Sequence, residues 1–184
     1  METFVLALPA ATPDRPDVAR LVARARAGDR AAYGDLYERM RGAVHAVILA
    51  RVPPSDVGDV MQDTFVAAWT QLSALREDAA FPGWVLEIAR RRSVDHGRRG
   101  RVRAHDELSE EGGATEDAPT LEAKRALEAI EALPMAYRET LLMRLVEGMT
   151  GPEIAEATGL TPESVRVNLC RGMKLLKERI GGDQ

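Results

Sequence analysis

The sequence is short of cysteine, aromatic residues and long apolar runs, and each shortage limits what the chain can be. Cys170 is the only cysteine in 184 residues, which excludes an internal disulfide and a cysteine-based metal cluster. Aromatic residues make up 4% of the chain, whereas Ala, Leu, Arg and Glu dominate, which favours helices. The apolar stretch from Thr3 to Leu8 is too short for a signal peptide or a membrane span. We therefore expect a cytoplasmic chain with a flexible tail at 1–16.

Lysine is scarce as well, with 3 lysines against 22 arginines. A preference for Arg over Lys is what GC-rich coding produces, so the arginine content alone does not indicate phosphate binding. The net charge of −4 does not indicate nucleic-acid binding either. The positions of the charges along the chain are more informative than their sum.

Hydrophobic residues make up 45% of the sequence and recur at the three- and four-residue spacing of amphipathic helices. Such helices are expected from about Asp17 to a break at Gly28, from Arg30 to Ala50, from a cap at Ser55 or Asp56 to Leu72, from Phe81 to Arg98, and from Thr120 nearly to the end. The chain is therefore predicted to be all-α, with one helical domain at 17–104 and a second at 120–184.

The charge changes sign abruptly between the two domains. A basic run, opposed only by Asp95, contains Arg90, Arg91, Arg92, Arg98, Arg99, Arg101 and Arg103. The segment 105–119 follows with six acidic residues and the breaks Gly112-Gly113 and Pro119. Because it has little that can pack, we expect a flexible, extended acidic linker.

The C-terminal part has the features of a helix-turn-helix. Thr150 and Glu153 have the spacing of a capping box at the start of a short helix. Gly159 then supplies a tight turn, and Thr161-Pro162 caps and opens a long last helix. This is the geometry that places a second helix in the DNA major groove.

Projection of the last helix at about 100° per residue separates two faces. An apolar arc contains Val165, Leu169, Gly172, Met173, Leu176 and Ile180, and a second arc contains Arg166, Val167, Cys170, Arg171, Lys174 and Lys177. An ordinary surface helix would also carry charges outside, but here the only acids, Glu163 and Glu178, lie near the ends. A basic face of this kind can neutralise phosphates and reach base edges.

The helix expected to end at Leu72 carries an acidic, partly apolar strip on one side, formed by Asp56, Asp59, Gln62, Asp63, Val66 and Thr70. Taken as structure alone, the strip is a solvated helix face. Taken as a docking surface, it suits a basic partner helix.

Two blocks of the sequence resemble the extracytoplasmic-function sigma factors of the sigma-70 family. Region 2 of that family is similar to Asp59-Val-Met-Gln62-Asp63-Thr-Phe65 with Trp69, followed by Phe81-Pro-Gly-Trp84 and Arg98-Arg99. Region 4 is similar to Leu133-Pro134, Glu153-Ile-Ala155 and Ser164-Val-Arg166. Two blocks in family order, joined by a linker without a third domain, are more specific than a helix-turn-helix alone.

The resemblance implies that region 2 docks on the beta-prime clamp helices of core RNA polymerase and opens DNA at the −10 element. Region 4 then reads the −35 element and meets the beta flap, and an anti-sigma factor is a further partner. By position, the polymerase contacts are Asp59, Gln62, Asp63 and Val66. The −10 contacts are Phe81, Arg91, Arg92, Asp95, Arg98 and Arg99. The −35 contacts are Thr161, Ser164, Arg166, Val167, Asn168, Cys170, Arg171 and Lys174.

Three positions keep a second interpretation. Phe81 and Trp84 can stack on exposed bases, but at helical spacing aromatic residues are also core residues. Gly172 stands inside a helix where the resembling family usually has Ala. It costs about 1 kcal/mol relative to Ala, which close packing of the helix at this point would explain.

The rival function is a free-standing helix-turn-helix regulator with a sensory or dimerising N-terminal domain. Such a domain has no need of an acidic docking strip followed by a basic run, so the sigma factor is favoured. An enzyme is not indicated, because His45, His96 and His105 are scattered and no phosphate loop or nucleophile signature occurs. No cofactor, metal or small-molecule substrate is expected.

Overall fold

The computed structural model describes the backbone of residues 17–106 and 121–181 and the side chains of 17–98 and 125–180. Within these ranges all regular elements are helical, which confirms the all-α prediction. The expected tail at 1–16 and the linker residues 107–119 lie outside the described residues. Among the described helices, none has both the length and the apolar character needed to cross a membrane.

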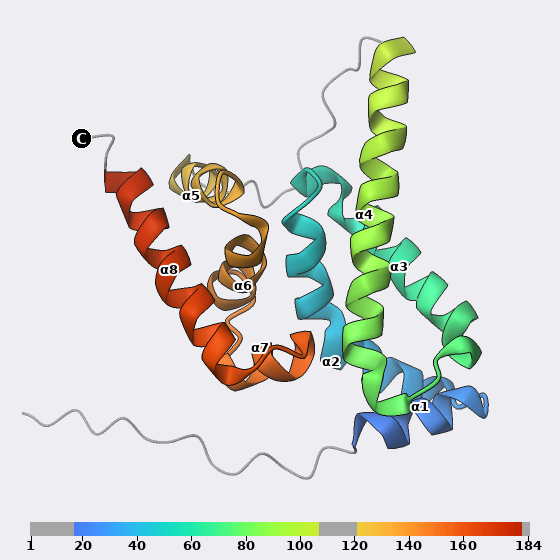
Figure 1. Ribbon diagram of the computed structural model, residues 1–184. Coiled ribbons are helices and arrows are strands. Elements are labelled where there is room, and N and C mark those ends of the chain that lie inside the picture. The colour runs from blue at the N-terminus through green and yellow to red at the C-terminus, as the bar shows by residue number, and fades with distance from the viewer. Residues whose placement is uncertain (1–16, 107–120, 182–184) are drawn as a thin grey trace, which may run out of the picture.

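An N-terminal group of helices occupies one part of the molecule (Figure 1). It contains α1 (Val18–Arg26), α2 (Arg30–Leu49), α3 (Val57–Gln71) and α4 (Phe81–Asp106), with the 3-10 turns η1 (Pro54–Asp56), η2 (Leu72–Ala74) and η3 (Asp78–Ala80) between them. Helix α4 is longer than predicted and continues through the basic run, because arginine is a good helix former. It includes residues 105 and 106, which the sequence assigned to the linker.

A C-terminal group contains α5 (Leu121–Glu131), α6 (Met135–Leu145), α7 (Gly151–Thr158) and α8 (Pro162–Gly181). The capping box is confirmed: the Thr150 amide donates to Glu153 Oε2 at 2.8 Å, and the Glu153 amide donates to Thr150 Oγ1 at 3.4 Å. Gly159 ends α7 in the left-handed region with φ of 72°, where an L side chain is strained. Thr161 Oγ1 accepts from the Ser164 amide at 3.1 Å and so caps α8.

The predicted apolar faces form the core. Val18, Leu21, Val22 and Ala25 of α1 are all buried, and the C-terminal half of α2 is buried on nearly every side. A single apolar cluster includes residues of both helix groups, and α2 lies against α6 and α7 (Figure 1). Ile180 departs from the projection, because the buried arc of α8 ends one turn earlier at Leu176 and leaves Ile180 51% exposed.

The prediction that a side chain of Ser55 or Asp56 caps α3 is wrong. Asp56 occupies the N-cap position, but its side chain makes no capping hydrogen bond. Its carboxylate accepts instead from the Ser55 hydroxyl at 2.8 Å and bonds His96 Nε2 at 2.9 Å. The Ser55 bond is the main reason that the pKa of Asp56 is lowered; burial opposes the shift and His96 adds to it. His96 therefore ties the middle of α4 to the start of α3.

Gly172 lies where α8 crosses α6. A Cβ atom at this position would stand 3.0 Å from Leu141 Cδ1 and 3.1 Å from Tyr137 Cβ, both on α6. Cβ contacts this short require the neighbours to shift, and Tyr137 Cβ is fixed to the backbone of its helix. The close-packing explanation for this glycine is confirmed.

We predict that Gly172→Ala lowers the free energy of unfolding by about 1–3 kcal/mol, because overpacking outweighs the better helix propensity of alanine. The matched control is Gly34→Ala in α2, where a new Cβ has nothing within 4 Å; this change should stabilise by up to about 1 kcal/mol. Urea denaturation followed by circular dichroism measures both. Equal stabilisation by the two changes would contradict the packing argument.

Candidate polymerase and promoter faces

Helix α8 presents the two faces that the projection predicted. Its inner face buries Val165 and Leu176 against the other C-terminal helices. Of the predicted −35 contacts, Arg166, Val167, Cys170, Arg171 and Lys174 are exposed, and Ser164 and Asn168 are half-buried. The outer face of α8 is therefore open and basic, and it can enter a DNA groove without repacking the core.

Thr161 and Ser164 have a structural part to play as well. Both stand at the start of α8, where the Thr161 hydroxyl donates to Ser164 Oγ at 2.9 Å while it accepts the capping bond. A helix N-terminus with polar side chains favours negative groups such as phosphates. Their predicted contact with DNA therefore fits their position, although the cap alone accounts for the residue types.

The acidic strip of α3 is also on the surface. Asp59, Gln62 and Asp63 are exposed, and Val66 is 56% exposed. The opposite side of α3 is buried through Val57, Val60, Thr64, Phe65, Ala67 and Ala68. All four predicted polymerase contacts thus share one solvent-facing side of a helix whose other side is fixed in the core.

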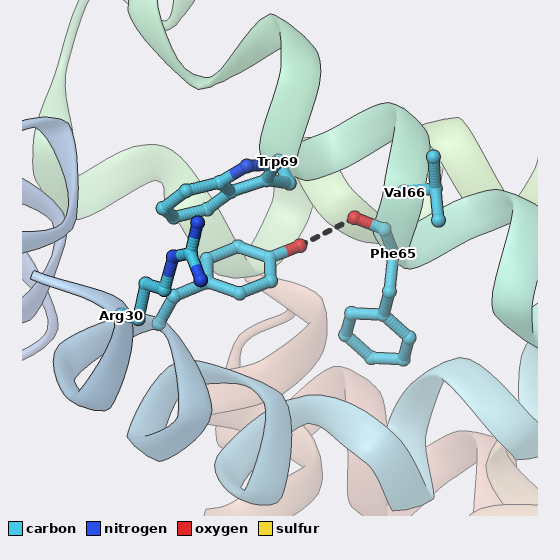
Figure 2. Close-up of a pocket in the computed structure, with 5 residues that line it drawn as sticks. Arg30, Phe65, Val66 and Trp69 are labelled. Atoms are coloured by element: carbon cyan, nitrogen blue, oxygen red, sulfur yellow. Dashed lines mark hydrogen bonds between the residues drawn. The ribbon is translucent and has the colours of Figure 1, made fainter. Parts of the chain in front are cut away.

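A hollow of about 380 Å³ lies beside Val66, between α2 and α3 (Figure 2). It is lined by Arg30, Tyr33, Phe65, Val66 and Trp69. Tyr33 donates its hydroxyl to the Phe65 carbonyl at 2.5 Å, and its ring meets that of Trp69 edge to face, with centroids 4.7 Å apart. Burial raises the pKa of Tyr33 to about 12.

Sequence reasoning missed this hollow. The sequence marks Trp69 only as part of the region 2 resemblance, and in the structure 37% of this residue is exposed. The hollow exists because α2 brings Tyr33 to the end of α3, and no local pattern encodes which helices pair. The hollow extends the exposed strip of α3 with an apolar surface.

The predicted −10 residues are only partly gathered on one face of α4. Arg91, Asp95 and Arg98 are exposed and Arg92 is half-buried; Arg91 pairs with Glu87 one turn away, with Nε and Oε1 3.3 Å apart. The side chain of Arg99 lies outside the described residues. Ser93, which lies between Arg92 and Asp95 in the sequence, is buried, and its hydroxyl donates to the Ala89 carbonyl.

The assignment of Phe81 to DNA is wrong in this structure. Its ring is fully buried, because it is the first residue of the α4 face that continues with Val85 and Ala89 into the core. Trp84 is half-buried and packs on the same core, with its ring centroid 6.0 Å from that of Phe81. Both rings therefore belong to the core, whereas Arg91 and Arg98 of the same helix are exposed to solvent.

Comparison with known proteins matches the two helix groups separately. The family model for sigma-70 region 2 matches residues 36–103, and the model for sigma-70 region 4 matches residues 123–176. The first therefore includes the acidic strip and most of α4, and the second includes α7 and most of α8.

Whole chains are similar as well. The RNA polymerase sigma factor CnrH of Cupriavidus metallidurans is 31% identical, covering 89% of this chain and 94% of that one. The ECF RNA polymerase sigma-E factor of Escherichia coli is 28% identical, covering 87% and 92%. A solved structure of CnrH in complex with the cytosolic domain of CnrY has a TM-score of 0.62 at 28% identity, covering 91% of this chain and 99% of that one.

The two family matches lie in sigma-factor order, on helix groups whose exposed faces carry the expected charges. A relative above 30% identity extends over nearly the whole chain. The protein belongs to the extracytoplasmic-function sigma factors of the sigma-70 family.

Proposed function

We propose that this sigma factor binds core RNA polymerase through the strip Asp59, Gln62, Asp63 and Val66 and directs initiation at its promoters. In this proposal the −10 element meets the arginines of α4, and the −35 element meets the outer face of α8. One observation carries the proposal. The helix group that matches sigma region 2 has an exposed acidic strip, and the other helix group has an open, basic last helix. A free-standing regulator is not favoured, because it has no use for region 2.

The domain limits follow the same division. We propose region 2 at 17–104, a linker at 105–119 and region 4 at 120–184, with the linker acting partly through its acidic residues. The chain acts by binding and not by catalysis, and it works in the cytoplasm, where the polymerase is.

An anti-sigma factor is part of the proposal. The similar sigma factor CnrH has been solved with the cytosolic domain of CnrY. The hollow between Tyr33 and Trp69 and the strip of α3 offer a comparable partner both apolar surface and negative charge.

Transcription in vitro tests the function directly. Purified core polymerase is incubated with a promoter library, with and without this chain. New transcripts whose start sites share upstream motifs at −10 and −35 are the expected result. Core polymerase that shows the same transcripts with and without the chain would contradict the proposal.

A charge reversal tests the acidic strip of α3. Asp59→Arg combined with Asp63→Arg should abolish binding to core polymerase, because the two arginines reverse the charge that a basic partner meets. The fold should stay intact, because both carboxylates are exposed. Binding is measured by fluorescence anisotropy and folding by circular dichroism. The control Glu128→Arg with Glu131→Arg makes the same charge change on exposed positions of α5 and should leave binding unchanged. Unchanged affinity of the α3 variant would remove the strip from the interface.

A further prediction concerns the orientation of α8. Cys170 is exposed in the middle of the basic face, so a bulky maleimide on it should block −35 recognition, and bound promoter DNA should slow the labelling. Labelling rates are measured by mass spectrometry on the holoenzyme with and without promoter. A Cys170→Ser, Ser73→Cys variant provides a control thiol at the exposed position 73 of η2. Bound DNA should not change the labelling rate of this thiol. Equal rates at Cys170 with and without DNA would show that α8 is oriented differently.

A further inference from the structure

The apolar surface that α2 and α3 leave exposed is concentrated around the hollow between them. The chain has 3 Phe, 3 Tyr and 2 Trp residues, and four of these aromatic residues lie here: Tyr33, Tyr37, Phe65 and Trp69. The rings of Tyr37 and Phe65 are in contact, with centroids 4.5 Å apart. Tyr37 and Trp69 are each 37% exposed, and Val66 is 56% exposed. A contiguous exposed apolar surface marks a place where another segment binds.

The size of the hollow limits what it can hold. Its volume of about 380 Å³ is near the lower end of the range of about 300–1,000 Å³ for ligand sites. The Tyr33 hydroxyl already donates to the Phe65 carbonyl, so Tyr33 contributes mainly its ring to the wall. The hollow is therefore lined largely by apolar surface, and it suits one or two large apolar side chains rather than a whole helix.

Arg30 places one positive charge at the hollow. It is exposed at the first position of α2, and Figure 2 shows its side chain extending toward Trp69. Among the residues that the structure describes, none forms an ion pair with Arg30. An apolar segment that carries a single acid therefore complements this surface in hydrophobicity and in charge.

The N-terminal residues of the chain include such a segment. Residues 1–8 read Met-Glu-Thr-Phe-Val-Leu-Ala-Leu, and Glu2 is their only charged side chain. The run is too short for a signal peptide or a membrane span, so insertion into a membrane does not account for its apolar character. Phe4, Leu6 and Leu8 supply the large apolar side chains that the hollow suits. This tail segment, residues 2–8, therefore matches the hollow in kind.

The chain between the tail segment and α1 is long enough to reach the hollow. Residues 9–16 include Pro9, Pro13 and Pro16, and a proline-rich stretch of this length spans about 25 Å. Helix α1 is about 14 Å long, it packs on α2, and the turn at 27–29 brings Arg30 close to its C-terminal end. So short a tether holds the segment at an effective concentration of about 1 mM, at which a contact with a dissociation constant of about 0.1 mM is occupied in about nine molecules of ten.

We propose that the tail segment docks in the hollow of its own chain, with Glu2 paired to Arg30, and that it must leave before core polymerase docks on the acidic strip of α3. Val66 lines the hollow and belongs to the strip, so the tail segment and the polymerase cannot both cover it. Residues 9–16 act as the tether, which narrows the expectation of a flexible tail to these positions. The competition with polymerase rests on the proposed function; the docking itself does not.

A distance measurement tests the docking in the full chain, without polymerase or DNA. Nitroxide labels are placed on Thr3→Cys and on Ser73→Cys, which is exposed in η2 shortly after Trp69, in a Cys170→Ser background, and electron–electron double resonance gives the distance distribution. The labelled parent should show one narrow distance. Phe4→Ser with Leu6→Ser should lower the ratio of docked to undocked molecules at least about tenfold and broaden the distribution, because the apolar contact is lost. The matched control Ala10→Ser with Ala11→Ser, in the tether, should leave the distance unchanged.

A charge swap tests the ion pair between the tail segment and α2. Arg30→Glu and Glu2→Arg, made separately, should each lower the docked ratio about two- to fivefold, since an exposed pair contributes modestly. The two changes together restore opposite charges and should restore the narrow distance. Arg30 is exposed, so these variants should fold like the parent, which circular dichroism checks.

A broad distribution in the labelled parent, or an unchanged narrow distance after Phe4→Ser with Leu6→Ser, would overturn the docking. A defined distance in a mixture of chains labelled singly at position 3 and singly at position 73 would place the tail segment on a second copy and overturn docking within one chain.

Binding of core polymerase separates the docking from the proposed function. Deletion of residues 2–8 should tighten this binding about tenfold, because the competing segment is gone. Equal affinities of the full and the shortened chain would contradict the competition. A chain whose tail segment docks, but which binds core polymerase in neither form, contradicts the proposed function and leaves the docking standing.

Discussion

The packing of α2 is the constraint on which the rest of the structure depends. One side of this helix packs against α1, α3 and α4, and the other meets α6 and α7. Ala43, Ala46 and Ala50 keep its C-terminal half narrow, and Val44, Val47 and Ile48 fill the space between neighbours. A helix buried on nearly all sides needs partners for its last carbonyls, and Arg138 supplies one from the opposite region. The acidic strip of α3 and the arginines of α4 lie on helices that pack against α2.

Local signals predicted the elements well. Gly28, the Thr150 capping box and Gly159 mark ends that follow from backbone chemistry within a few residues, and the structure has helix boundaries at each. The open faces of α3 and α8 were also predictable, because helical periodicity alone decides which side chains share a side. The length of α4 was not predicted: its arginines favour a helix, but the basic run lacks the apolar spacing by which helices are recognised in a sequence.

What the sequence could not provide is the pairing of distant elements. Glu139 and its partner Arg51 are separated by 88 positions, and nothing near either residue indicates the other. The same is true of Tyr33 and Trp69, which form the hollow only because α2 and α3 are neighbours. Phe81 shows the converse: its type and its place beside a basic run suit a base-stacking residue, and only the direction in which α4 begins sends it into the core.

The crossing of α6 and α8 at Gly172 has a consequence for how promoter preference can change. The inner face of α8 is restricted to a few side chains by its contact with Leu141 and Tyr137, whereas the exposed side chains of Arg166, Val167 and Arg171 contribute little to the core. In the proposed function, substitutions on the outer face can therefore alter the DNA sequence that α8 reads with little effect on stability. Duplicated genes of such a chain can diverge in their target promoters while the same scaffold is inherited unchanged.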